Sequence, residues 1–122
     1  MIVWVTRDES PDGPLSSALR ARGLEVILEP AVTRHVVADP AVLLAGLGAD
    51  DWLILTSPFA IETVARTPLA KVPQVAVVGE SSRRLADQLG LRVRLTGTDG
   101  HGDALFAELR NEVRGGVVCY PR

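Results

Sequence analysis

Short continuous runs of apolar residues recur along the chain, separated by polar segments that are rich in turn-forming residues. Such runs are typical of strands that are buried on both faces of a sheet. Residues 91–95 instead alternate between apolar and charged side chains, which predicts an edge strand. Strands are therefore expected at residues 2–6, 24–28, 51–55, 75–78, 91–95 and 117–120, with residues 36–37 as a short addition.

The segments between these runs carry apolar residues at helical spacing, with polar residues on the opposite side. Helices are expected at residues 14–22, 40–47 and 58–66, then from the serine pair 81–82 to residue 89, and from residues 102–103 to 113. Because strands and helices alternate throughout, the pattern predicts an α/β fold. We expect a mainly parallel sheet with helices on both faces.

The expected core is aliphatic, since aromatic residues make up only 4% of the chain and hydrophobic residues 47%. Trp4 and Cys119 lie in predicted strands and are expected inside this core. Four residues of the last helix are expected to face the sheet: Leu105, Phe106, Leu109 and Val113.

Two junctions in which a buried strand leads directly into a helix carry most of the functional information. In the first, the central strand at 51–55 runs into Thr56, Ser57 and Pro58. Serine is a good helix N-cap, and proline suits the first helical position because it lacks an N–H group. In the second junction, Gly79 permits a tight turn and Ser81 or Ser82 is expected to cap the following helix.

These junctions, together with Thr6 and Arg7 after the first strand, predict a binding site for an anionic small molecule. The carboxyl ends of parallel strands meet at one edge of the sheet, where α/β proteins bind ligands. Helix N-termini at that edge offer backbone N–H groups and a dipole that favours negative charge. The alternative is that Ser57 and Ser82 are ordinary caps and that Arg7 is an ordinary surface residue.

Composition and charge narrow the functional classes. Lys and Arg number 13 against 15 Asp and Glu, so the net charge of −2 argues against nucleic-acid binding. Cys119 is the only cysteine, which excludes an internal disulfide and leaves nothing to support a metal site. The sequence shows no signal peptide and no apolar run of the roughly 18 residues that span a bilayer. We therefore expect a cytoplasmic protein without membrane contact. The Walker A and G-x-G-x-x-G phosphate-binding motifs are both absent.

The ordered set of motifs resembles the first half of uroporphyrinogen-III synthase. The chain begins VWVTRDESPDGPLSSALRARGLEVILEP and continues with DDWLILTSPFAIETVA, QVAVVGESSRRLADQLGLRV, DALFAEL and GGVVCYPR. The family has corresponding landmarks in this order: a strand ending in Thr-Arg, a D-W…T-S segment, and a V-G-x-x-T segment. The chain departs from it at Phe59, Ser82 and Arg83, where the family often has Asn, Thr and a small residue.

The resemblance implies a flavodoxin-like lobe, half of a two-lobed enzyme that is about twice as long as this chain. Such an enzyme closes hydroxymethylbilane with inversion of ring D, through a spiro intermediate and without a cofactor or a metal. It acts mainly by holding the substrate's carboxylates. By this resemblance, Thr6, Arg7, Thr56, Ser57, Pro58, Gly79, Ser81 and Ser82 would bind substrate. The family's cleft tyrosine lies in the missing half, and its role is not carried over to Tyr120.

Several alternatives stay open. The 122 residues suit one domain. Residues 36–122 form its main lobe. Residues 1–30 either join the same sheet as the later strands, pack separately, or swap onto a partner chain. An active synthase would be completed by a second copy in a homodimer or by pairing with a missing half. The second hypothesis is a half-length relative without catalysis, acting as a carboxylate-binding or interaction module. A third is an unrelated flavodoxin-like binding domain.

Overall fold

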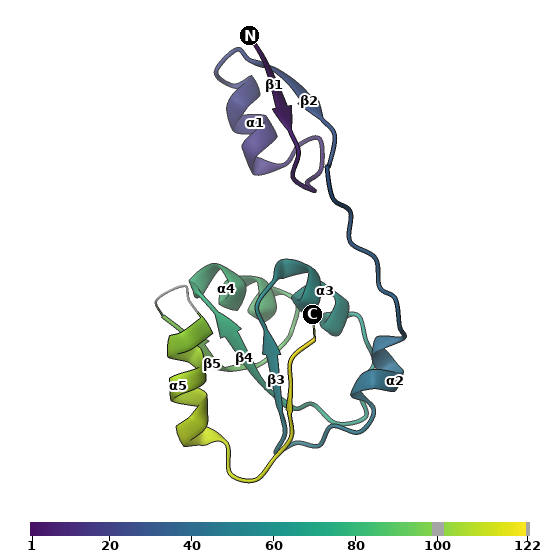
Figure 1. Cartoon of the computed structure of the whole chain (residues 1–122), viewed down its shortest axis with the longest axis vertical. Coiled ribbons are helices and arrows are strands. Elements are labelled where there is room, and N and C mark those ends of the chain that lie inside the picture. Colours follow the sequence, from purple (N-terminus) through teal and green to yellow (C-terminus); the bar gives the residue numbers. More distant parts are fainter. Residues whose placement is uncertain (99–101, 122) are drawn as a thin grey trace. The chain divides into compact units, whose positions relative to one another are not determined.

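The structure, a computed structural model, describes residues 1–98 and 102–121. The chain divides into two compact units, Met1–His35 and Val36–Arg122 (Figure 1). Within each unit every strand pair is parallel and helices connect the strands. The predicted α/β class is confirmed, and it fits the flavodoxin-like arrangement of a parallel sheet flanked by helices.

The unit Met1–His35 is a single strand–helix–strand motif. Strand β1 (Ile2–Val5) pairs in parallel with β2 (Glu25–Leu28), and α1 (Pro14–Arg20) connects them. Gly23 has φ +76°, a left-handed conformation that glycine adopts without strain after a helix. The helix covers one face of this sheet, on which Val5 is buried.

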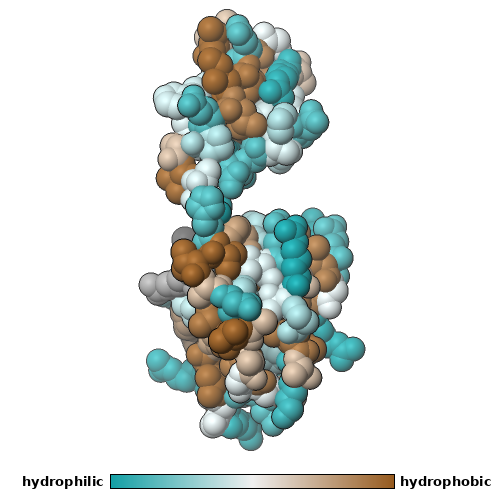
Figure 2. Space-filling model, turned by 90° about the vertical axis from the view of Figure 1, so that its right-hand side faces the viewer, coloured by the Kyte–Doolittle hydropathy of each residue, from teal (hydrophilic) through white to brown (hydrophobic). Residues whose placement is uncertain are grey.

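The opposite face of the β1–β2 sheet is open, so the expectation that the first strand is buried on both faces was wrong. Ile2 and Trp4 are 59% and 60% exposed, and Ile27 on β2 is 46% exposed. Trp4 is therefore outside the core, and its indole Nε1 donates a hydrogen bond to the Glu29 carbonyl at 3.1 Å. Figure 2 shows strongly hydrophobic residues gathered on the surface of this unit. The physical reason is that the motif has one helix, which can cover only one face.

The unit Val36–Arg122 contains a four-stranded parallel sheet with the order β5-β4-β3-β6. The predicted edge position of the 91–95 region is confirmed, because β5 is one edge of this sheet. No strand forms at residues 36–37, where Val37 is 98% exposed, so that prediction was wrong. The elements are α2 (Pro40–Leu44), β3 (Trp52–Leu55), α3 (Pro58–Ala65), β4 (Gln74–Val78), α4 (Glu80–Gln88), β5 (Val93–Gly97), α5 (Gly102–Glu112) and β6 (Val118–Cys119).

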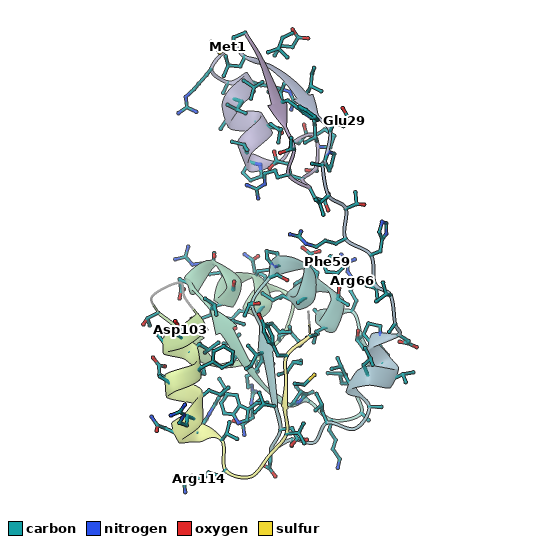
Figure 3. All side chains as sticks on the ribbon, in the orientation of Figure 1. Met1, Glu29, Phe59, Arg66, Asp103 and Arg114 are labelled. Atoms are coloured by element: carbon teal, nitrogen blue, oxygen red, sulfur yellow. The ribbon has the colours of Figure 1, made fainter. Side chains whose placement is uncertain are left out.

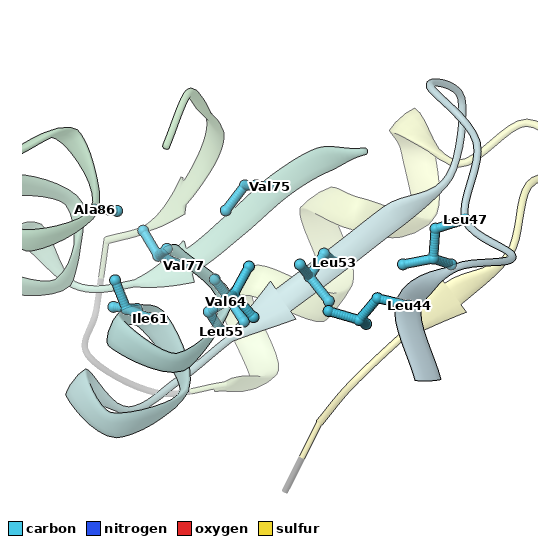
Figure 4. Packing of buried hydrophobic residues seen from close by; sticks show 9 residues of the cluster. All are labelled: Leu44, Leu47, Leu53, Leu55, Ile61, Val64, Val75, Val77 and Ala86. Atoms are coloured by element: carbon cyan, nitrogen blue, oxygen red, sulfur yellow. The ribbon is translucent and has the colours of Figure 1, made fainter. Parts of the chain in front are cut away.

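Helices cover both faces of this sheet, as predicted. One core cluster joins the sheet to α2, α3 and α4 through Leu44, Leu47, Leu53, Leu55, Ile61, Val64, Val75, Val77 and Ala86 (Figure 4). On the other face, α5 contributes Leu105 and Leu109 to a second cluster with Trp52, Ile54 and Ala76. Phe106 is 45% exposed, so its predicted inward position was wrong, whereas Cys119 and Val113 are partly buried.

The carboxylate of Asp51 joins the loops that precede the two neighbouring strands β3 and β6. Its Oδ2 accepts a hydrogen bond from the Gly48 N–H at 2.6 Å, and its Oδ1 accepts one from the Val117 N–H at 2.7 Å. The Gly48 hydrogen bond, followed by the Val117 bond, lowers the pKa of Asp51 below its ordinary value of 3.8. The ionised carboxylate therefore holds the short strand β6 against β3.

Asp51→Asn is expected to lower the melting temperature, because asparagine has one acceptor oxygen and its NH2 group would face one of the two N–H donors. Folding lowers the pKa of Asp51, so its contribution to stability is complete above 3.8 and is lost as the pH falls through the folded-state pKa. Circular dichroism melts should show a gap between wild type and variant at neutral pH that narrows below pH 3.8. Asp50→Asn, which removes the neighbouring charge, is the control and should show no such gap. A gap of constant size across this pH range would contradict the prediction.

Candidate functional site

The carboxyl edge of the β3–β4 pair is where the predicted site residues come together. The two strands pair in register from Trp52 opposite Gln74 to Leu55 opposite Val77, so their carboxyl ends are level. The residues that follow them therefore share one edge of the sheet. The predicted residues that the structure brings together here are Thr56, Ser57, Pro58, Gly79 and, in the first turn of α4, Ser81 and Ser82.

The junction between β3 and α3 has the predicted geometry. Ser57 is the N-cap, and its Oγ accepts a hydrogen bond from the Ala60 N–H at 3.2 Å. Pro58 occupies the first helical position, as expected. Phe59 and Arg66 mark the two ends of this helix in Figure 3. The Ser57 hydroxyl is thus used within the fold, as a cap that fixes where the helix begins.

The junction between β4 and α4 differs from the prediction. Gly79 is the N-cap, with φ +80° and ψ 154°, a backbone region that only glycine adopts without strain. The helix begins at Glu80, so Ser81 and Ser82 lie inside it and neither caps it; Ser82 is buried and Ser81 is exposed. The reason is that the turn at Gly79 completes the change of direction two residues before Ser81 and three before Ser82.

The first turn of α4 therefore lacks the side-chain cap that Ser57 provides for α3. The Gly79 N–H donates to the Gly97 carbonyl at 2.9 Å, which holds the turn against the end of β5. A helix start without a side-chain cap can accept the oxygens of an anion. The carboxylate of Glu80 also lies in this turn, 3.4 Å from the Arg84 guanidinium with which it pairs.

Tyr120 is a residue of this edge that the sequence analysis did not assign to the site. It follows β6, which pairs with β3, and its phenolic oxygen lies 3.1 Å from Thr56 Oγ1. The ring packs edge-on against Phe106, with 6.4 Å between centroids and 74° between the ring planes. Its position directly after a strand was visible in the sequence, but the pairing of that strand with β3 was not.

Thr6 and Arg7 belong to the other unit, Met1–His35. The Arg7 Nε lies 3.5 Å from Glu9 Oε2, and the Glu9 side chain is only 6% exposed. Glu9 Oε1 accepts hydrogen bonds from the Ser16 N–H at 2.7 Å and the Ser16 hydroxyl at 2.6 Å. The Ser16 hydroxyl is the main cause that lowers the pKa of Glu9. Glu9 thus occupies the start of α1, and Arg7 already has an acidic partner within the chain.

A surface depression of ≈ 850 Å³ lies at the other edge of the sheet in Val36–Arg122. Its lining includes Gln74 and Val93, the first residues of β4 and β5, together with Arg92 and Arg94. This depression is therefore distinct from the carboxyl edge that the sequence predicts to bind ligand. Two arginines nevertheless make it a place where an anion could bind, so a binding experiment must separate the two edges.

Within residues 1–98 and 102–121, no three His, Cys, Asp or Glu side chains are grouped so that they could hold a metal ion. In the same part of the chain no helix has the length and apolar character that crossing a membrane requires.

Comparison with known proteins gives one family match. The sequence model of the family described as uroporphyrinogen-III synthase HemD matches residues 13–122. No curated protein and no solved structure matches the chain significantly. The match covers both junctions at the carboxyl edge and the segment that contains Tyr120.

Proposed function

Because the chain belongs to the uroporphyrinogen-III synthase family, we propose that it acts in tetrapyrrole (haem) biosynthesis, in the closure of hydroxymethylbilane with inversion of ring D. The observation that carries this proposal is the family match over residues 13–122, which includes the whole carboxyl edge of β3 and β4. The substrate is a linear tetrapyrrole with acidic side chains, so its recognition is a problem of binding carboxylates.

The residues at this edge have the chemistry for that task. The first turn of α4 has no side-chain cap, and its backbone N–H groups suit a carboxylate. The exposed hydroxyl of Thr56 can donate a further hydrogen bond, which is stronger than usual when the acceptor is charged. Ser57 and Gly79 contribute by fixing the starts of α3 and α4 rather than through free side-chain atoms. Arg7 forms an ion pair with Glu9, so its guanidinium would bind substrate only by breaking this ion pair or by contacting both carboxylates at once.

Positioning is the mechanism that these residues support best. The linear substrate closes without inversion in the absence of an enzyme, so the protein has to favour one geometry of closure over another. Holding reactive groups in the productive orientation can supply a large part of a rate enhancement. Within residues 1–98 and 102–121, the carboxyl groups with shifted pKa values are those of Glu9 and Asp51, and both accept hydrogen bonds from backbone N–H groups and serve the fold.

The use of the Glu9 and Asp51 carboxylates within the fold favours a second candidate function, a carboxylate-binding module without catalysis. Carboxyl groups used within the fold are not placed as proton donors for a leaving hydroxyl group. In this alternative the chain would bind a tetrapyrrole through the same edge and leave its closure unchanged.

We also propose that two copies of the chain pair. The resemblance implies a substrate held between two lobes, and the unit Val36–Arg122 forms one compact unit with one such edge. Light scattering over a range of protein concentrations would support this with a mass of twice 13.0 kDa. A mass that stays at the monomer value in the presence of ligand would overturn it.

The test is a cyclisation assay with freshly made hydroxymethylbilane, in which type III and type I uroporphyrinogen are separated. Type I forms spontaneously and is the blank, so we expect type III in excess over that blank with the folded chain. Only type I, together with saturable binding of a porphyrin carboxylate, would replace the synthase by the binding module. Only type I and no binding would overturn both functions.

A further inference from the structure

Three side chains form a corner between β3, β6 and α5: Thr56, Phe106 and Tyr120. We call this set the β3–β6 corner. The packing of the fold explains why they meet. On β3, Trp52 and Ile54 face α5, and side chains alternate along a strand, so Thr56 is the next residue on that side. Tyr120 follows Cys119, which is paired with Leu53 of β3.

The geometry of the corner is well defined. The two hydroxyl oxygens of Thr56 and Tyr120 are 3.1 Å apart, a hydrogen bond in which either can donate. The ring of Phe106 meets the ring of Tyr120 edge-on. Gly102 lies against the ring of Phe106, because a Cβ atom added to Gly102 would be 3.4 Å from Phe106 Cε2. In Figure 3, Asp103 marks the start of α5, close to this edge, and Arg114 lies just beyond the end of the helix.

The corner combines exposed apolar area with hydrogen-bonding groups. Phe106 is 45% exposed and Tyr120 is 37% exposed, although both pack against neighbours. When the Tyr120 hydroxyl donates to Thr56 Oγ1, the hydrogen of the exposed Thr56 hydroxyl can donate to a ligand, and the first bond strengthens the second. An aromatic surface beside a hydroxyl donor matches a flat ring that carries a carboxylate.

We propose that the β3–β6 corner binds one pyrrole ring of the substrate. Thr56 donates to a carboxylate on that ring, Tyr120 orients the Thr56 hydroxyl, and the rings of Tyr120 and Phe106 pack against the pyrrole. This assignment rests on the proposed function, because the substrate of that function is a tetrapyrrole whose pyrrole rings carry carboxylates. It adds Phe106 and Tyr120, on the α5 side of the sheet, to Thr56 and the helix starts of α3 and α4.

The experiment uses the fact that Tyr120 is the only tyrosine of the chain. Tyrosine labelled with ¹³C at Cζ gives a single NMR signal, which is titrated with uroporphyrin I, a porphyrin with an acetate and a propionate on each pyrrole. We expect this signal to shift with saturation. Uroporphyrin I should bind about tenfold more weakly to Thr56→Val. Valine keeps the shape of the threonine side chain but lacks the hydroxyl group that donates to the carboxylate. Tyr120→Phe should weaken binding by a smaller factor, since the ring stays.

Thr67→Val is the matched control, since its hydroxyl donates to the Thr63 carbonyl at the far end of α3. It should bind uroporphyrin I like the wild type. Phe106→Leu tests the ring contact separately and should also weaken binding. Circular dichroism melts of all variants check that each is folded, and backbone amide shifts in the same titration identify the edge that binds.

The outcomes separate this proposal from the proposed function. Binding that shifts the amides of α4 but leaves the Tyr120 signal and the affinity of Thr56→Val unchanged would overturn the corner and keep the carboxylate-binding edge. Shifts confined to Arg92 and Arg94 would place the ligand in the depression at the opposite edge and overturn both. If the folded wild-type chain does not bind uroporphyrin I, both the corner and the carboxylate-binding edge are overturned.

Discussion

Replacing Gly79 by alanine is expected to lower the free energy of unfolding by about 1–3 kcal/mol and to weaken tetrapyrrole binding together with stability. The backbone at this residue has φ +80° and ψ 154°, where any side chain is strained. A Cβ atom would meet nothing within 4 Å, so the whole cost comes from the backbone and not from a clash. Relief of the strain requires the turn to change its conformation.

That change would reach the candidate site directly. The Gly79 N–H donates to the Gly97 carbonyl at 2.9 Å, and α4 begins at the next residue. A rotated turn would break this bond and redirect the N–H groups of the first turn. We therefore expect porphyrin binding to fall by more than in any substitution of an exposed residue elsewhere on α4.

Gly46→Ala is the matched control. A Cβ atom at Gly46 also meets nothing within 4 Å, but its φ lies outside the left-handed region. The substitution should leave stability nearly unchanged or raise it by about 0.4–1 kcal/mol, through a lower entropy of the unfolded chain. Denaturant unfolding of the two variants measures the difference. Equal free energies of unfolding for both would contradict the role assigned to the Gly79 turn.

Replacing Ile54 by alanine is expected to lower the free energy of unfolding by about 2–5 kcal/mol, the largest effect on stability that we predict. Ile54 has no exposed surface and lies in the central strand, where it packs with Trp52, Leu105 and Leu109. The rigid sheet can collapse only partly around the lost side chain, so a cavity remains. A loss of this size is a large fraction of the stability of an ordinary domain.

The unfolding of Val36–Arg122 can be followed by fluorescence of the buried Trp52 in a Trp4→Phe background, because Trp4 belongs to the other unit. Leu43→Ala, a truncation of a leucine that is 67% exposed on α2, is the control and should stay within about 0.5 kcal/mol of the parent. If the two truncations cost the same, the core assignment of β3 would be wrong.

Most elements of the fold were predictable because their signals are local. The run at β3 is apolar at every position, and Asp39 with Pro40 and Ser57 with Pro58 mark the starts of α2 and α3 as the structure has them. Proline and a capping side chain act within one helical turn, so their effect does not depend on distant residues. The start of α4 was misread because glycine and serine both permit a helix start, and only the backbone of Gly79 decides between them.

The candidate site was predicted in part. The alternation of strands and helices indicated that Thr56, Ser57 and Gly79 share an edge, and the pairing of β3 with β4 brings them there. The partner of Thr56 was not predictable, because Tyr120 is 64 positions away along the chain. Their contact depends on β6 being the neighbour of β3, and strand order has no signature in the composition of either strand.

The sequence by itself determined the α/β class, the edge at which the helices begin and the family of the chain. These follow from hydrophobic periodicity, capping residues and the order of motifs, all of which operate over short stretches. Only the tertiary structure decided which faces are covered. Trp4 and Phe106 have the apolar character of core residues, yet both are exposed, because burial depends on which element packs against a given face. It also decided that Glu9 holds Arg7 and that Tyr120 meets Thr56, since pairs of this kind are made by the approach of segments in space.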